Sequence, residues 1–324
     1  MRVLIAFDGS RDAESALDDL RACGLAHAGE AKVISIAEVW LPPKDALNEK
    51  VSAADAYLEK VLADARTRSD RAVSEAEMMA RYAANRVRVL LPEWEVSAIA
   101  SSGSPAWEIV DEAKKFDADL IVVGAQGNSL FSRIALGSIS QKVLTEARCS
   151  VRIGRGSIDI DPGPQRIVVG FDGSKGAIAA VRSVSDRTWS SGTEIRLVSA
   201  AEPSVPPAIS RFVNPAGRAT IGIRSSDRVW FENSAETALA SLAEAGLDAR
   251  LTVRDGNPKH VLVEEAETWG ADCIFVGANA RGGLLERFVV GSTSAAVAAR
   301  AHCSVEVVRN SGSSGNGRPN QKSA

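Results

Sequence analysis

Short apolar runs alternate with amphipathic stretches along the first half of the chain. The apolar runs predict five strands, at residues 3–7, 33–39, 96–101, 119–125 and 149–154. Helical patterns lie between them, and these predict helices from Ser10 to about residue 28, from Gly103-Ser104-Pro105 to about 116, and at about 138–147. Alternating strands and helices of these lengths are typical of parallel sheets with right-handed crossovers. The run at 119–125 shows no polar alternation, which indicates a strand covered on both faces.

The second half of the chain repeats the first. Residues 2–10, RVLIAFDGS, recur as RIVVGFDGS at 166–174, and residues 103–126 are echoed at 256–279. The repeat predicts five more strands, at residues 166–171, 194–200, 248–254, 272–277 and 303–308. An internal repeat of this length indicates two related domains. We therefore predict an α/β fold of two tandem, doubly wound, five-stranded parallel sheets of the Rossmann-like type.

Composition shifts set the domain boundaries. We predict one domain at 1–154 and a second at 166–309, each of a size that buries a core of its own. The segment 155–165 carries Gly, Pro and Asp without a period, which indicates a linker. The last segment, 310–324, is rich in Ser, Gly and Asn and has the composition of a flexible tail.

The halves differ most between their second and third strands. No Pro or Gly occurs between Pro43 and Pro92, and apolar residues recur at helical period, so we predict a helix over about 52–91. Such a helix is roughly 60 Å long at 1.5 Å per residue. Two interpretations stay open: a core-covering helix with an extension, or an arm for dimerisation or partner binding. The matching part of the second half is a proline-rich stretch, 203–215, before a shorter helix from about residue 226.

Charge and composition exclude several classes of function. The formal net charge of −3 gives no basic footprint, so we expect neither nucleic acid nor an anionic membrane as a partner. The chain has no apolar stretch near the ~18 residues of a membrane span and no leader pattern, so a cytoplasmic location is expected. The four cysteines stand singly without metal-ligand spacing, which favours buried thiols. The sequence has no cluster of histidines and acids of the kind that binds a metal ion, so a catalytic metal site is not expected.

The strongest chemical signal follows the fourth predicted strand. Gly124-Ala-Gln-Gly127 is followed by nine residues and then by Gly137-Ser138. Ligands of parallel sheets bind at the carboxyl edge, where this loop leaves the sheet. Glycines at Gly124 and Gly127 allow positive φ and a close approach of the backbone to an anion. Gly137-Ser138 places free amides at a helix N-terminus, which favours a phosphate; the alternative is an ordinary structural loop.

With these residues in view, the chain resembles a tandem universal stress protein, two domains of that family fused. The resemblance is carried by the strand ending in Asp8-Gly9-Ser10, the Gly103-x-Pro105 helix start, and the spacing from Gly124 to Ser138. It implies a Rossmann-like, adenine nucleotide alpha hydrolase-like fold and an ATP-binding site, with Mg²⁺ as a possible companion. The spacing matches the signature of the nucleotide-binding branch of the family.

The resemblance also implies a role for each matching position. Asp8 would meet the nucleoside, and Ala37 would offer backbone groups to the adenine edge. Asp8 has an alternative role as a turn and cap residue before the first helix. The positions that would contact ribose and phosphates are Val123, Gly124, Gln126, Gly127, Gly137, Ser138, Ile139 and Ser140.

The second half departs from this pattern. It keeps Asp172, Gly277, Gly291 and Ser292, but Ala280 stands where the second glycine of the loop would be. The loop is also one residue longer, with 14 positions from Gly277 to Gly291 against 13 from Gly124 to Gly137. Misplacing one amide bond to a charged group costs about 1.5–3 kcal/mol. We therefore predict one good nucleotide site, in the first half, and one doubtful site in the second.

Three functions remain open at this stage. The first is an ATP-binding regulatory protein of the stress-response kind, with at most slow hydrolysis because no general base is identifiable and no Walker lysine is present. The second is a scaffold of the same family that binds no nucleotide and acts through unidentified protein partners. The third is an enzyme of nucleotidyl-transfer type, although the loop after the first strand lacks the pattern of that class.

The resemblance also implies that the two domains pair within the chain as a pseudo-dimer, since the last strands of two domains commonly pair in this family. Whole chains would then be able to form homodimers. An unpaired apolar edge at 149–154 would invite aggregation, which favours the pairing on physical grounds.

Overall fold

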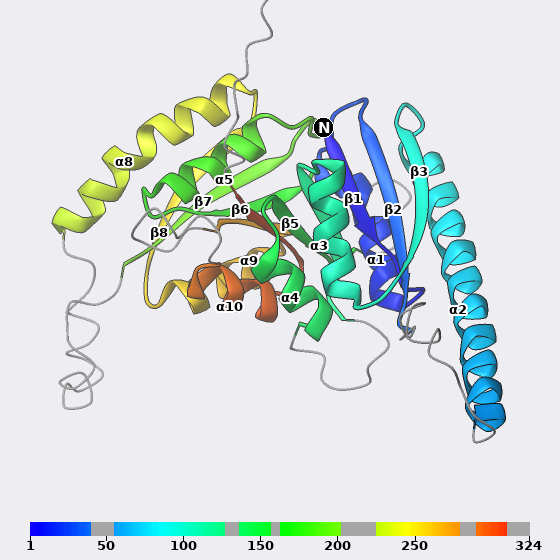
Figure 1. Cartoon of the computed structure of the whole chain (residues 1–324). Coiled ribbons are helices and arrows are strands. Elements are labelled where there is room, and N and C mark those ends of the chain that lie inside the picture. Colours follow the sequence, from blue (N-terminus) through cyan, green and yellow to red (C-terminus); the bar gives the residue numbers. More distant parts are fainter. Residues whose placement is uncertain (40–54, 127–135, 157–162, 202–224, 279–289, 310–324) are drawn as a thin grey trace, which may run out of the picture.

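The computed structural model describes two halves with the same order of elements (Figure 1). The described residues are 1–39, 55–126, 136–156, 163–201, 225–278 and 290–309. The first half contains β1 (Arg2–Ala6), α1 (Arg11–Asp18), a short 3₁₀ helix (Asp19–Cys23), β2 (Glu30–Ala37), α2 (Asp55–Leu90), β3 (Glu95–Ser102), α3 (Pro105–Phe116), β4 (Leu120–Gly124), α4 (Ser138–Glu146) and β5 (Ser150–Gly154). The second half contains β6 (Arg166–Gly170), α5 (Lys175–Ser185), β7 (Glu194–Ala201), α8 (Ser225–Glu244), β8 (Asp248–Asp255), α9 (Pro258–Trp269), β9 (Cys273–Gly277), α10 (Ser292–Arg300) and β10 (Ser304–Val308).

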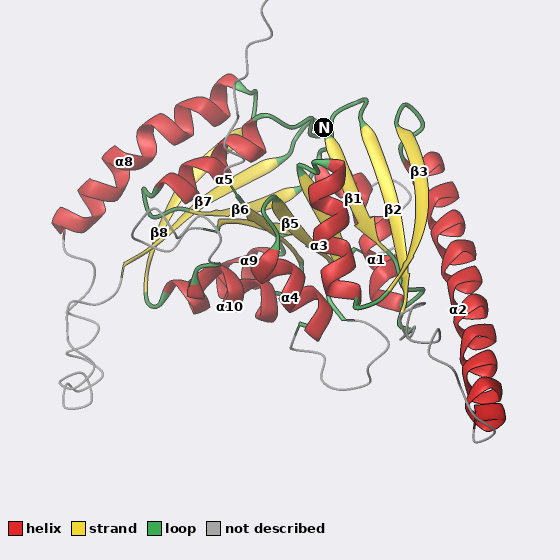
Figure 2. Ribbon diagram, in the orientation of Figure 1, coloured by secondary structure: helices red, strands yellow, loops and turns green. Residues whose placement is uncertain are grey.

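The ten strands in the described part of the chain belong to one sheet, in the order β3-β2-β1-β4-β5-β10-β9-β6-β7-β8 (Figure 2). Within each half every strand pair is parallel. The order 3-2-1-4-5 is that of a doubly wound fold, whose direction of winding reverses between β1 and β4. The α/β fold class predicted from the apolar runs is therefore confirmed.

The two halves meet where β5 pairs with β10, the antiparallel step in this sheet. Val305 lies opposite Ile153, Glu306 opposite Arg152, and Val307 opposite Val151. The hydrophobic core continues across the step, because one cluster joins residues under α3 and α4 to residues under α9 and α10. The halves thus share a core as well as a sheet.

Helices cover both faces of the sheet. In the first half, Leu17 of α1 and Val87 of α2 pack with Ile5 on one face. On the other face, α3 and α4 contribute residues such as Ile109 and Val143 to the shared cluster. The second half repeats this division, with α5 and α8 on one face. Every residue of β4 is buried, as its unbroken apolar run predicts.

The long helix predicted at 52–91 is present as α2, over 36 residues. Alanines on one side of it, including Ala76, Ala80 and Ala84, are buried, and their small size brings the helix close to β2 and β3. At 1.5 Å per residue the helix is about 54 Å long, whereas an eight-residue strand spans about 26 Å. Its N-terminal part extends beyond the strands (Figure 1).

Two element boundaries differ from the predictions. The first helix ends well before residue 28, because Asp19–Cys23 tighten into a 3₁₀ turn and Gly24, with φ of 60°, closes it. Glycine adopts this left-handed conformation without steric cost. The second strand starts at Glu30, not at 33, since its polar first residues still pair with β1 and β3. The proline-rich stretch 203–215 and the tail 310–324 lie outside the described residues, as does most of the linker.

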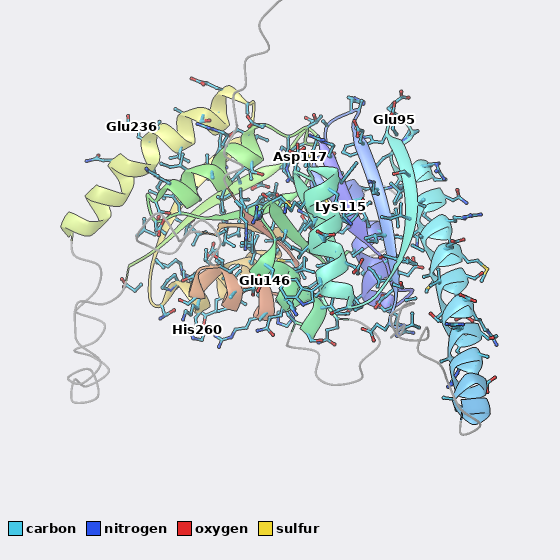
Figure 3. The ribbon with its side chains drawn as sticks, viewed as in Figure 1. Glu95, Lys115, Asp117, Glu146, Glu236 and His260 are labelled. Carbon is cyan, nitrogen blue, oxygen red and sulfur yellow. The ribbon has the colours of Figure 1, made fainter. Side chains whose placement is uncertain are left out.

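The surface of the molecule carries charged side chains in the usual manner. Figure 3 labels six of them on five elements and a turn, all exposed: Glu95, Lys115, Asp117, Glu146, Glu236 and His260. No helix in the described part of the chain is long and apolar enough to cross a membrane.

Candidate functional site

The candidate site lies at the carboxyl edge of the sheet, between β1 and β4. These neighbouring strands pair in parallel, with Ile5 opposite Val122, so their carboxyl ends meet at this edge. The winding of the sheet reverses at this point, which is where ligands of such sheets bind. Asp8 follows β1 and Gly124 ends β4, so the fold brings these two predicted residues to the same edge of the sheet.

Asp8 is exposed and takes part in a tight turn. Its Oδ1 accepts a hydrogen bond from the amide of Ser10 at 3.0 Å. Ser10 is the N-cap of α1, and its side chain accepts from the amide of Ala13. The turn therefore fixes the carboxylate of Asp8 at the strand end with one oxygen bonded to the protein. The cap role and the ligand role of this residue are compatible.

Gly124 is required for the approach of α1 to the sheet. A Cβ at this position would lie 2.6 Å from the carbonyl carbon of Asp12. Gly124 is not among the glycines with positive φ, so the expectation that it supplies a left-handed turn is wrong. Its lack of a side chain instead lets the first turn of α1 pack directly on the end of β4.

The N-terminus of α4 is held against the same strand end. The amide of Gly137, the N-cap residue of α4, donates to the carbonyl of Ala125 at 2.9 Å. The hydroxyl of Ser140, which is buried, donates to the carbonyl of Gly124 at 2.7 Å. These two bonds place the first amides of α4, at Ser138 and Ile139, close to the end of β4. Helix N-terminal amides have no partner within the helix and favour an anion.

The remaining predicted positions have the following places. Ser138 is exposed, whereas Ile139 packs partly into the core. The side chain of Val123 is buried, so a ligand would meet this residue through its backbone. Ala37 ends β2, and its carbonyl already accepts from the amides of Val39 and Gly103. Gly127 lies outside the described residues.

Asp12 is a residue of the candidate site that the sequence reasoning missed. Its Oδ2 accepts from the amide of Gln126 at 2.7 Å, so a carboxylate on α1 fixes the first residues of the glycine-rich loop. The sequence signal was an acidic residue in the first turn of a helix, which is common for reasons unrelated to ligands. In the second half, counting from Asp8 and Asp172, the position of Asp12 is occupied by Gly176.

A cavity of about 240 Å³ adjoins the loop on the side of the second half. Its lining combines the start of the loop, the end of β5 and the C-terminal end of α10. The lining residues are Asp12, Ser15, Ala125, Gln126, Gly154, Arg155, Gly156, Ala299 and Ala301.

The second half keeps the supports of the site. The hydroxyl of Ser294 donates to the carbonyl of Gly277 at 2.6 Å, and the amide of Gly291 donates to that of Ala278 at 2.8 Å. Asp172 is exposed and accepts from Ser174, as Asp8 accepts from Ser10. Ser292 is exposed at the first turn of α10. Ala280 lies outside the described residues, so the difference between the two loops rests on the sequence.

The cysteines lie in apolar or crowded surroundings. Burial raises the pKa of Cys149 to about 11 and that of Cys303 to about 12. Burial also raises the pKa values of Cys23 and Cys273. Thiols with pKa values this high are protonated at neutral pH and are poor nucleophiles.

The arrangement defines a class of protein: a pair of doubly wound α/β domains with a glycine-rich loop and a helix N-terminus at the switch point of the sheet. Comparison with known proteins gives the family. The model of the universal stress protein family matches twice, over residues 1–153 and 164–309, and the chain belongs to that family.

Individual relatives cover different parts of the chain. A universal stress protein of Thermus aquaticus is 33% identical over 153 residues, which is 47% of this chain and 97% of that protein. A relative from Methanocaldococcus jannaschii is 40% identical over 73 residues, 22% of this chain, and one from Mycobacterium tuberculosis strain H37Rv is 28% identical over 200 residues, 60% of this chain. These alignments span 43% and 63% of the two relatives.

The fold also has a solved counterpart of matching length. The crystal structure of a universal stress protein from Archaeoglobus fulgidus aligns with a TM-score of 0.61 and 20% identity, over 95% of this chain and 96% of that one. At this level of identity the likeness shows a shared fold.

Proposed function

We propose that the first half binds an adenine nucleotide, with ATP as the principal ligand, and that the protein acts as a nucleotide-responsive regulator in the stress response. One observation carries the proposal. The carboxylate of Asp8 and the N-terminus of α4 lie at the same strand edge, and Ser140 and Gly137 tie that helix to the end of β4. The charges suit the ligand, since amides at the helix N-terminus favour phosphates and a carboxylate accepts from ribose hydroxyls or an adenine amine.

A relative in the family supports an adenine nucleotide as the ligand. One universal stress protein has been solved in complex with cAMP, and it is 26% identical to 45% of this chain, with a TM-score of 0.31. That complex belongs to that protein. For this chain, Mg²⁺ would accompany ATP as the counter-ion of its phosphates, and turnover would be slow because no general base is assigned at the candidate site.

The second half is proposed as the weaker site. It retains Asp172, Gly277, Gly291 and Ser292, but Ala280 replaces the second loop glycine. In the same proposal the paired halves act as a pseudo-dimer with one high-affinity nucleotide site.

The test is the nucleotide content of the purified protein, measured by acid release and chromatography, together with calorimetric titration of ATP into stripped protein. We expect about one equivalent per chain by the one-site argument above. A Gly127→Val variant should lose binding, and the matched Ala280→Val variant should keep it. Absence of both nucleotide and heat at millimolar ATP with Mg²⁺ would contradict the proposal.

A second candidate function is that of a scaffold, favoured by the outer side of α2. Met78, Tyr82 and Val89 are exposed by 61%, 52% and 74% and recur at helical spacing along this helix. Exposed apolar side chains in a row suit a protein partner. The scaffold candidate is tested if ATP does not bind. A variant with Met78→Lys and Val89→Lys is compared with an Arg81→Lys control for the capture of protein partners. Loss of partners that the native protein and the control both capture would support this candidate.

A further inference from the structure

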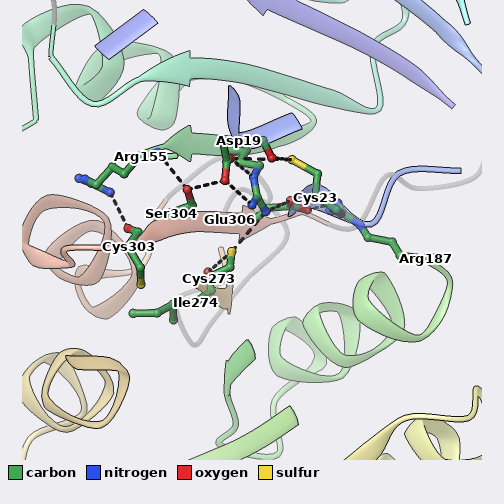
Figure 4. A network of polar contacts seen from close by, with 10 residues as sticks. Asp19, Cys23, Arg155, Arg187, Cys273, Ile274, Cys303, Ser304 and Glu306 are labelled. Carbon is green, nitrogen blue, oxygen red and sulfur yellow. Dashed lines mark hydrogen bonds and ion pairs between the residues drawn. The ribbon is translucent and has the colours of Figure 1, made fainter. Parts of the chain in front are cut away.

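Two charged side chains face each other at the centre of the junction between the halves. Arg152 of β5 and Glu306 of β10 lie directly opposite in the antiparallel register. Both are fully buried, and the Nη1 of Arg152 lies 3.4 Å from the Oε2 of Glu306. Figure 4 shows the network around Glu306, which links both halves.

These two residues occupy the same position in the internal repeat. Residues 147–155, ARCSVRIGR, correspond to 301–309, AHCSVEVVR, so Arg152 is the counterpart of Glu306. The flanking pairs, Val151 with Val307 and Ile153 with Val305, are arranged symmetrically about them. A pseudo-twofold axis therefore passes through this one pair of residues, at which the two halves carry opposite charges.

Each of the two charges is also held by its own half, with different chemistry. Asp19 accepts from the Nε and Nη2 of Arg152 at 2.5 and 3.0 Å. Glu306 instead accepts from Arg187 and, at 3.5 Å, from the hydroxyl of Ser183. Counted from the helix caps Ser10 and Ser174, Ser183 is the counterpart of Asp19. The second half, which carries Glu306, therefore has a hydroxyl where the first half has the carboxylate of Asp19.

The pocket that receives the arginine exists in the second half. The Nη1 of Arg152 lies 3.2 Å from the Sγ of Cys273, and its guanidinium is 6.0 Å from the ring centre of Phe275. Counted from Gly124 and Gly277, the counterparts of these residues in the first half are Leu120 and Val122. A first half therefore has neither the thiol of Cys273 nor the ring of Phe275 at these two strand positions.

The rim of the junction, by contrast, is similar in the two halves. Arg155 donates to the carbonyls of Ala298 and Cys303 at the end of α10. Its repeat counterpart, Arg309, donates to the carbonyls of Leu144 and Ala147 at the end of α4. The rim would serve two identical halves as well as two different ones. Only the centre distinguishes them.

We propose that the surface centred on Arg152 accepts one kind of partner, a second half bearing Glu306, and excludes a copy of itself. Two first halves in this register would place two buried arginines opposite each other, with about 4.5–5.5 Å between their Cα atoms. Two second halves would oppose two buried glutamates. In either identical pair each charge keeps the partner of its own half, Asp19 or Arg187, but exchanges the attraction across the junction for repulsion between buried like charges. Such like-charge contacts are a common source of partner specificity. The inference depends on the pairing of the halves and not on nucleotide binding.

The test starts from the full chain with a protease site inserted between Gly156 and Gly163. Nitrogen-15-labelled and unlabelled samples are cleaved after folding and then mixed. The halves are exchanged in one of two ways: urea is increased until mixed-isotope pairs appear, or the mixture is fully unfolded and refolded. Native mass spectrometry then counts the pairs. We expect first-half–second-half pairs, with each kind of identical pair below about a tenth of the signal. Random reassortment, with about a quarter of the signal in each kind of identical pair, would overturn the proposal.

Two variants separate the centre from the rim. Asp19→Ser combined with Arg152→Met removes the Asp19 carboxylate and the Arg152 guanidinium from the first half. We expect the signal from pairs of identical first halves to rise at least about tenfold. Arg155→Met combined with Arg309→Met removes the rim contacts from every kind of pair, so it should weaken pairing without changing the ratio of pair types. An Asp19→Ser, Arg152→Met variant that stays as selective as the native protein would also overturn the proposal. The native-protein experiment stands if a variant fails to fold.

Discussion

Replacing Asp19 by alanine should destabilise the protein more than any surface substitution. The carboxylate accepts two hydrogen bonds from Arg152 and a third from the hydroxyl of Ser304, at 2.7 Å. Without it, the hydrogen-bonding partners of the fully buried Arg152 among the described residues are Glu306, at 3.4 Å, and the thiol of Cys273. Glu306 is itself already bonded to Arg187, so one buried positive charge is left poorly compensated.

The size of the effect follows from the burial. Removing one partner of a buried ion pair costs about 3–5 kcal/mol, because the remaining charge stays out of water. That is a large share of the 5–15 kcal/mol by which native domains are typically stable. A double variant, Asp19→Ala with Arg152→Met, removes the stranded charge and keeps most of the arginine's apolar volume. We expect it to recover at least about half of the loss, since buried pairs are often replaceable by apolar residues.

Urea unfolding followed by tryptophan fluorescence measures both variants. The control is Glu75→Ala, which breaks the ion pair between Arg71 and Glu75 on α2. The side chains of these two residues are 83% and 52% exposed, respectively. An exposed helical pair contributes about 0.3–0.5 kcal/mol, so this variant should barely move the midpoint. The reasoning is refuted by a loss below about 1 kcal/mol for Asp19→Ala. A double variant no more stable than the single one would refute it equally.

Three further predictions concern packing, capping and pH. Gly277→Ala should lower the free energy of unfolding by about 1–3 kcal/mol in urea titrations, because its Cβ would lie 2.3 Å from the backbone of Gly176; an unchanged midpoint would show that α5 shifts freely. Ser10→Ala should cost about 1 kcal/mol through loss of the α1 cap, measured against Ser10→Asn, which restores a cap and should cost little. The pKa of Cys149 is raised from 9.0 to about 11, so the folded state favours the protonated thiol, and stability from this group is full below pH 9 and lost as pH rises toward 11. Urea midpoints at pH 8 and 10.5 should therefore fall more for the native protein than for Cys149→Ala, and equal falls would contradict the assignment.

Much of the fold could be predicted because local signals and tertiary structure agree. The apolar run at 119–125 reads as a strand buried on both faces, and β4 is one. The Gly103-x-Pro105 start fits a helix whose first turn has no need of amide donors, and α3 begins at Pro105. The absence of Pro and Gly from 44 to 91 permits α2. The internal repeat then transfers each of these conclusions to the second half.

Other features depend on contacts that the sequence does not contain. Gly124 reads as a flexible loop residue, but its role is to admit the backbone of Asp12, which only the packing of α1 reveals. Arg152 and Glu306 stand out as single charges in apolar strands, yet their pairing requires the register between β5 and β10. The first helix ends in a 3₁₀ turn that closes at Gly24, and the spacing of apolar residues does not predict this turn.

The antiparallel step between β5 and β10 also decides which way the candidate sites open. Because every strand pair within a half is parallel, the strand direction of the whole second half is reversed relative to the first at this step. The carboxyl edge of the first half therefore lies beside the amino edge of the second, which is why the end of α10 lines the cavity next to Gln126. A ligand bound after β4 and a ligand bound after β9 would lie at opposite edges of the sheet. The molecule thus presents its two candidate sites at opposite edges of the sheet, so a partner that contacts the first candidate site would not contact the second directly.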